Sequence, residues 1–121
     1  MYAIDVARVA ATQDPDLGTA SARLFRVLGD PTRLAVLELL LDRPRTVSQL
    51  VDALGVSQSK MSNHLACLRW CHFVETERAG RVVTYRVADR RVRRVLEQGR
   101  QLADEHCEHL VSCGRIGPDW V

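Results

Sequence analysis

The feature that most constrains the fold is a series of closely spaced helix start and stop signals in the first half of the chain. Asp30-Pro31 places a capping side chain before a proline at the first helical position. Thr46 and Gln49 form a capping box, Gly55 supplies a stop, and Ser57 supplies the next cap. Such spacing predicts short helices joined by tight turns.

Apolar residues recur at helical spacing between these signals. A modestly amphipathic first helix is expected over residues 20–28, and a second helix begins at Pro31. The buried stripe of this second helix is expected to comprise Leu34, Leu37, Leu40 and Leu41. A third helix over 47–54, the turn 55–57 and a fourth helix to about Trp70 fit the helix-turn-helix of DNA-reading proteins.

A β-hairpin and a last helix complete the expected fold. Residues 73–78 and 82–87 alternate apolar and polar side chains around Ala79-Gly80-Arg81, as a hairpin does. Asp89 caps a last helix that runs to about Val111. Its apolar side is expected to hold Val92, Val95, Leu96, Leu102 and Ala103. The sequence thus predicts a mainly α winged helix-turn-helix domain over residues 20–112, with an N-terminal arm (1–19) and a C-terminal tail (113–121).

Length and composition fit one such domain. The chain has 121 residues, of which 46% are hydrophobic, and this suffices for one core. No run approaches the roughly 18 apolar residues of a membrane span, so no membrane partner is expected. The N-terminus lacks the basic start and apolar run of a secretory signal. We therefore expect a cytoplasmic protein whose four cysteines are thiols.

Positive charge is concentrated after the turn at residue 55. The net charge is only +2, but residues 60–100 hold ten Lys and Arg against four Asp and Glu. A local basic surface beside a sequence-reading helix suits contact with DNA phosphates. For the arginines of 90–94, a merely solvated helix face is an equal alternative.

Two cysteines lie one helical turn apart on the expected reading helix. Side chains at i and i+4 share a helix face, so the thiolates of Cys67 and Cys71 could take one thiophilic cation. The alternative is two small buried apolar residues, because free cysteine is among the most buried residue types. A disulfide is not expected, since Cβ atoms at this spacing lie ~5 to 6 Å apart.

Together these motifs resemble the ArsR/SmtB family of bacterial metal-sensing repressors over about residues 20 to 112. The resemblance is carried by residues 28–37 (LGDPTRLAVL), 49–58 (QLVDALGVSQ), 62–68 (SNHLACL) and the wing 80–85 (GRVVTY). It implies a homodimer, formed through the first and last helices, that binds operator DNA and is released by metal.

Two sensor sites common in that family are absent from this sequence. Residues 47–52 contain no cysteine box, and the last-helix zinc site is incomplete because Arg91 follows Asp89 where a histidine is usual. The pair Cys67 and Cys71 instead resembles the cadmium- and lead-sensing branch, whose members recruit a third cysteine from the C-terminal region. We expect Cys107 in that role ahead of Cys113. His106, Glu108 and His109 are expected to be solvated or outer partners rather than ligands.

The DNA-contacting residues are expected at the start of the reading helix and at the tip of the wing. The helix residues are Gln58, Ser59, Lys60, Ser62, Asn63 and His64, and the wing residues are Arg78 and Arg81. His64 could equally cap or pack. For the two arginines, contact with the DNA backbone or minor groove is favoured over a merely solvated position. Met61, Leu65 and Leu68 are expected to belong to the core.

The predicted function is a metal-responsive repressor with a soft effector ion, Cd(II) or Pb(II) or Hg(II), and no organic cofactor. A thiol-redox sensor or an arsenite sensor of the same fold is the alternative. A purely structural dimerisation module is less consistent with the basic wing. An enzyme is not expected, because the chain has no glycine-rich phosphate loop and no third group orienting a cysteine-histidine pair.

Overall fold

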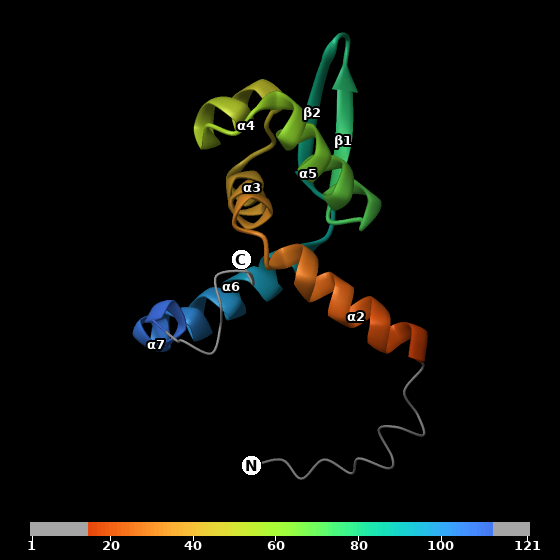
Figure 1. The fold of residues 1–121 in the computed structure, drawn as a ribbon. Coiled ribbons are helices and arrows are strands. Elements are labelled where there is room, and N and C mark those ends of the chain that lie inside the picture. The colour runs from red at the N-terminus through yellow and green to blue at the C-terminus, as the bar shows by residue number, and fades with distance from the viewer. Residues whose placement is uncertain (1–14, 113–121) are drawn as a thin grey trace.

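The computed structural model describes residues 15–112, which form helices and one antiparallel hairpin (Figure 1). The elements in chain order are α2 (Pro15–Leu28), α3 (Pro31–Asp42), α4 (Val47–Leu54), α5 (Gln58–Trp70), β1 (Val74–Ala79), β2 (Val82–Val87), α6 (Arg90–Glu105) and α7 (Cys107–Ser112). The helices α3, α4 and α5 and the hairpin form a reading head. Below it in Figure 1, α2 and α6 diverge to opposite sides. No helix among the described residues is long and apolar enough to cross a membrane.

Side chains cap the helices as the sequence predicts. Asp30 caps α3 by accepting the N–H of Arg33 at 2.9 Å, and Pro31 occupies the first turn. Thr46 and Gln49 form both hydrogen bonds of the capping box of α4. Ser57 and Asp89 cap α5 and α6 in the same way. These caps satisfy N–H groups that have no partner within a helix.

Two helix boundaries differ from the prediction. The first described helix, α2, begins at Pro15 instead of Ala20, because proline suits a first helical turn and Asp16 complements the helix dipole there. Residues 15–19 of the expected arm therefore belong to this helix, while residues 1–14 lie outside the described part. The expected last helix is broken at His106, since Asp104 and Glu105 place negative charge at the C-terminus of α6.

The recognition helix α5 ends in a Schellman motif. His72 adopts a left-handed conformation (φ 62°), its N–H donates to Arg69 O at 3.1 Å, and the Phe73 N–H donates to Leu68 O at 2.9 Å. Phe73 and Leu68 are both buried, which adds the apolar contact usual for this motif. The turn directs the chain from Cys71 into β1.

The hairpin forms the wing. Strand β1 pairs with β2 from Val74 opposite Val87 to Ala79 opposite Val82, and Gly80 (φ 64°) and Arg81 make the turn. Arg45, in the loop before α4, exchanges two backbone hydrogen bonds with Tyr85, at 2.8 and 3.0 Å. This bridge fixes the base of the wing to the helix-turn-helix.

The core lies where α3, α4 and α5 meet the hairpin. Its buried members are Val36, Leu37, Leu40, Leu50, Met61, Leu65, Leu68, Phe73, Val74, Val92 and Leu96. The predicted stripe of α3 is partly wrong: Leu34 and Leu41 are only half-buried, whereas Val36 is fully buried. The reason is that α3 is covered on several sides, by α4, α5 and β2.

One apolar surface is left uncovered by the described chain. Phe25 on α2 is 64% exposed, and Val95 and Leu102 on α6 are 41% and 61% exposed. The expectation that Val95 and Leu102 lie on an apolar side of the last helix holds, but within one protomer that side faces outward. Phe25, Val95 and Leu102 line one shallow groove between the two helices.

Candidate metal centre and nucleic-acid interface

The first turns of α5 expose a polar surface. Gln58, Ser59, Lys60, Ser62 and Asn63 are all exposed, while Met61 between them is fully buried. The structure therefore brings five of the six predicted helix contacts onto the solvent side of the recognition helix. Their amide, hydroxyl and ammonium groups can donate to base edges or to phosphates.

His64, the sixth predicted contact, lies elsewhere. It is half-buried, with Nδ1 3.5 Å from Arg33 Nη1 and 4.0 Å from Asp30 Oδ1. Arg33, on α3, also donates from Nε to Val27 O at 2.9 Å. Its side chain therefore links the end of α2 to His64 of α5. His64 is therefore placed to pack against the α2–α3 corner, which is one of the two roles that its sequence position left open. The Asp30–Arg33 spacing was a detectable signal for the cap, but this corner was not foreseen.

The wing carries its free positive charge at the tip. Arg78 and Arg81 are exposed, and neither is paired with a carboxylate of the described residues. Arg86, nearer the base, pairs with Glu75 at 2.8 Å and with Glu77 at 3.7 Å. The tip arginines are thus available to phosphates, whereas the charge of Arg86 is largely compensated.

Cys67 and Cys71 are brought together on the half-buried side of α5. Both are free, half-buried thiols, Cys67 within the last turns of α5 and Cys71 at its C-cap. Burial raises the pKa of the Cys71 thiol, the neighbouring Cys67 raises it further, and the positive charge of Arg33 opposes both effects. Two adjacent sulfur donors fit a soft metal ion, which displaces the thiol protons when it binds.

Cys71 also opens into a groove of about 340 Å³ between α2 and the start of α6. Leu24, Leu28, Phe73, Val92 and Val95 give the groove apolar walls, and His72, Asp89 and Arg91 complete the lining. Asp89 is held ionised: hydrogen bonds from Arg91 lower its pKa to about 2. The cysteine pair is therefore adjacent to both helices that carry the uncovered apolar surface.

Among residues 15–112, no third sulfur donor lies beside the cysteine pair. No three His, Cys, Asp or Glu residues between 15 and 112 are grouped closely enough to hold a metal ion. Cys107 is exposed at the start of α7. A helix the length of α6 spans about 24 Å, and α7 lies at its far end (Figure 1). Cys113 lies outside the described residues.

Comparison with known proteins identifies the family. Residues 30–76 match the model of the bacterial regulatory proteins of the arsR family. The chain is 41% identical over 96 residues to the probable mercury resistance operon repressor of Streptomyces lividans, covering 79% of this chain and 77% of the relative. The chain belongs to the ArsR family. The family and the relatives are transcriptional regulators, so the expectation that the chain is not an enzyme is confirmed.

Two solved structures support the ArsR assignment. The homodimeric winged helix-turn-helix DNA-binding domain from Mycobacterium bovis has a TM-score of 0.71 at 32% identity and covers 90% of this chain and 95% of its own. The cadmium metal-sensor CmtR from Mycobacterium tuberculosis has a TM-score of 0.55 at 45% identity, over 64% of this chain and 80% of its own. The predicted winged helix-turn-helix fold and ArsR membership are therefore both confirmed.

Proposed function

We propose that this ArsR-family protein is a repressor that binds operator DNA as a homodimer and releases it when thiolates of Cys67 and Cys71 take up a soft metal ion. The observation that carries this proposal is the pair of neighbouring half-buried thiols on the recognition helix, Cys67 within α5 and Cys71 at its C-cap. A change at these thiols acts on the element that contacts DNA.

The donor chemistry favours Cd(II), Pb(II) or Hg(II). Thiolates select soft ions, and a site built mainly of sulfur gives little advantage to ions that prefer oxygen. The names of two relatives, a mercury resistance repressor and a cadmium sensor, support Hg(II) and Cd(II). An organic cofactor has no role in this proposal.

The proposed DNA interface joins the exposed start of α5 to the tip of the wing. It comprises Gln58, Ser59, Lys60, Ser62, Asn63, Arg78 and Arg81. In helix-turn-helix proteins the first turns of the second helix face the base edges. His64 is assigned instead to the corner formed with Asp30 and Arg33, where it would relay a shift of α5 to the end of α2.

The proposed dimer interface is the uncovered apolar surface of α2 and α6. Phe25 and Leu102 are both more than half exposed, and burying such side chains against a second copy is favourable. The Mycobacterium bovis neighbour is homodimeric, which supports this arrangement.

The third ligand in this proposal is Cys107 of the partner subunit. Within one protomer Cys107 is separated from the pair by the length of α6, but α6 runs along the proposed dimer interface. A two-fold axis at that interface brings the end of one α6 towards the beginning of the other. The tail cysteine, Cys113, is the alternative donor.

Release requires that the metal-bound protein favour a conformation that binds DNA poorly. Two donors on one rigid helical turn distinguish weakly between conformations, because they move together. A donor from the other subunit makes the site sensitive to how the two subunits are arranged.

The raised pKa of Cys71 counts against thiol-redox sensing, which depends on an exposed thiolate of low pKa. Arsenite shares the preference for thiolates, so it is kept as a titrant in the test.

The test is an anaerobic titration of the reduced full-length protein with Cd(II), Pb(II), Hg(II), Zn(II) and arsenite, followed by thiolate charge-transfer absorption in the ultraviolet. We expect saturation with the soft ions and loss of most of the signal in Cys67→Ser and Cys71→Ser. An unchanged signal in both variants would place the metal elsewhere and contradict the proposal.

A further inference from the structure

Within residues 15–112, the long helix α6 packs on the rest of the protomer by one side. Val92 and Leu96 are buried against the core, while Val95 and Leu102 face outward on the surface proposed to bind the second subunit. The position of α6 relative to the reading head therefore depends on what joins it to α3.

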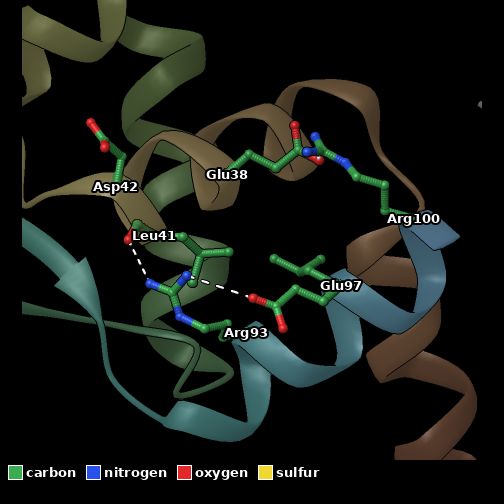
Figure 2. A pocket seen from close by; sticks show the side chains of 7 residues that line it. Glu38, Leu41, Asp42, Arg93, Glu97 and Arg100 are labelled. Carbon is green, nitrogen blue, oxygen red and sulfur yellow. Dashed lines mark hydrogen bonds and ion pairs between the residues drawn. The ribbon is translucent and has the colours of Figure 1, made fainter.

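Two arginines of α6 make that junction (Figure 2). Arg93 donates from Nη2 to Leu41 O at 2.7 Å, and Arg100 forms an ion pair with Glu38 at 2.5 Å. We call these two contacts the α3–α6 clasp. They border a polar pocket of about 380 Å³ between the helices. Glu97 approaches Arg93 at 3.7 Å within α6 but makes no ion pair with α3.

The clasp suits its place at the end of α3. Leu41 lies in the last turn of α3, where backbone carbonyls have no partner within the helix. A guanidinium bound to such a carbonyl also complements the negative end of the helix dipole. The Arg100–Glu38 ion pair lies about one turn before Leu41 on α3 and about two turns after Arg93 on α6. Two contacts separated along both helices restrain the angle between them, which a single contact cannot do.

That angle matters because α3 carries the reading head. It packs against α4, α5 and β2, whereas α6 carries the outward apolar residues. In a dimeric helix-turn-helix protein, two recognition helices must enter major grooves about 34 Å apart. A small rotation of α6 against α3 changes that separation.

We propose that Arg93 and Arg100 are positioning residues for DNA binding, which set the separation of the two recognition helices by fixing α6 against α3. This inference rests on the proposed homodimeric DNA-binding function. Neither arginine touches DNA in this account. Their effect passes through the angle between the two helices.

A charge-swap experiment tests the clasp. The variants are Glu38→Arg, Arg100→Glu and the double variant with both changes, and Glu97→Gln is the matched control. The probes are a duplex selected by the parent protein from random sequence and the same duplex with one half-site scrambled. Circular dichroism and thermal unfolding verify that each variant folds.

Each single variant is expected to bind the two-half-site duplex about fivefold to tenfold more weakly, since each dimer loses two Arg100–Glu38 ion pairs and gains two repulsive contacts in their place. Binding to the single half-site should change less than twofold, as it does not depend on the separation. The double variant should recover most of the loss, and Glu97→Gln should behave like the parent.

The direction in which Glu38→Arg changes DNA affinity distinguishes loss of the clasp from a general attraction between added positive charge and DNA. Added positive charge alone would tighten DNA binding, whereas a broken clasp weakens it. Tighter binding by Glu38→Arg, or equal losses on both duplexes, would overturn the inference.

Small-angle X-ray scattering of the DNA-free dimer gives a second readout that needs no operator. The single variants should broaden the distribution of interatomic distances, and the double variant should restore it. Unchanged scattering would also contradict the clasp. Failure of the parent to select any duplex would instead contradict the proposed function.

Discussion

Asp30 serves two neighbouring elements at once. Its carboxylate caps α3 by accepting the Arg33 N–H, and it faces His64 of α5. Burial acts to raise the pKa of Asp30, but the hydrogen bond from Arg33 and the charges of Arg33 and His64 lower it overall, below 3.8. The ionised form is therefore the one that stabilises the fold.

Asp30→Ala is expected to lower the free energy of unfolding by about 1 kcal/mol at pH 7, the usual cost of losing such a cap. A carboxylate of lowered pKa contributes fully above its unfolded pKa and loses its contribution as pH falls through the folded value. The difference from the parent should therefore shrink below about pH 3.8. Asn also caps well, so Asp30→Asn should lose much less at pH 7. Urea unfolding at pH 7 and pH 3 measures this, and an equal deficit at both would contradict it.

The raised pKa of Cys71 predicts how metal affinity depends on pH. A thiol that is still protonated must lose its proton on binding, so affinity should rise with pH by up to roughly tenfold per unit for each such thiol. Competition titrations of Cd(II) against a chelator between pH 6 and 8 measure the slope. Cys71→Ser should bind more weakly with a shallower slope, and a parent slope of zero would contradict this assignment.

At the scale of elements, the reading head was predictable and the ends of the fold were not. The caps at Thr46, Ser57 and Asp89 depend on residues two or three positions away, so the local sequence contains the whole signal. The break at His106 depends on a balance of charges at the end of α6. The burial of Val36 in place of Leu41 depends on several elements packed around α3, which periodicity alone does not contain.

The start of α5 and the wing together provide a matched test of the DNA interface. Lys60→Ala, Arg78→Ala and Arg81→Ala should each weaken binding and reduce the dependence of log affinity on log salt by roughly 2 per dimer, as two phosphate contacts are lost. Metal affinity should stay the same. Arg86→Ala is the control, because Arg86 is already paired with Glu75 and Glu77. Equal slopes for all four variants and the parent would remove these residues from the interface.

For the whole molecule, the sequence pattern specifies only part of the proposed metal site. The pair Cys67 and Cys71 was detectable because the helical period places both on one face. The proposed third donor comes from a second chain, and no pattern within one chain specifies where that chain lies. The described protomer places Cys107 beyond the far end of α6, which favours the partner chain over the same chain as the source of this proposed donor.

A mixed dimer distinguishes a shared site from one within a single chain. The double variant Cys67→Ser with Cys71→Ser keeps Cys107, and the variant Cys107→Ser keeps the pair. The homodimer of the double variant should bind metal poorly, and the homodimer of Cys107→Ser should bind it with an incomplete set of thiolates. A heterodimer of the two should regain one complete site if Cys107 acts across the interface, with a three-thiolate absorption band at half the parent intensity. Cys113→Ser should bind like the parent. No recovery in the heterodimer, together with loss in Cys113→Ser, would assign the third donor to Cys113.

The most direct test of the central claim is the release of DNA by metal under strict reduction. Fluorescence anisotropy of a labelled selected duplex is followed while Cd(II) is added to the parent, Cys67→Ser and Cys71→Ser. The parent should lose affinity by roughly 5- to 150-fold, the usual range of coupling between two sites. Both variants should bind the duplex as the metal-free parent does and stay bound. Release of either variant at the same metal concentration would contradict a sensor built on these two cysteines.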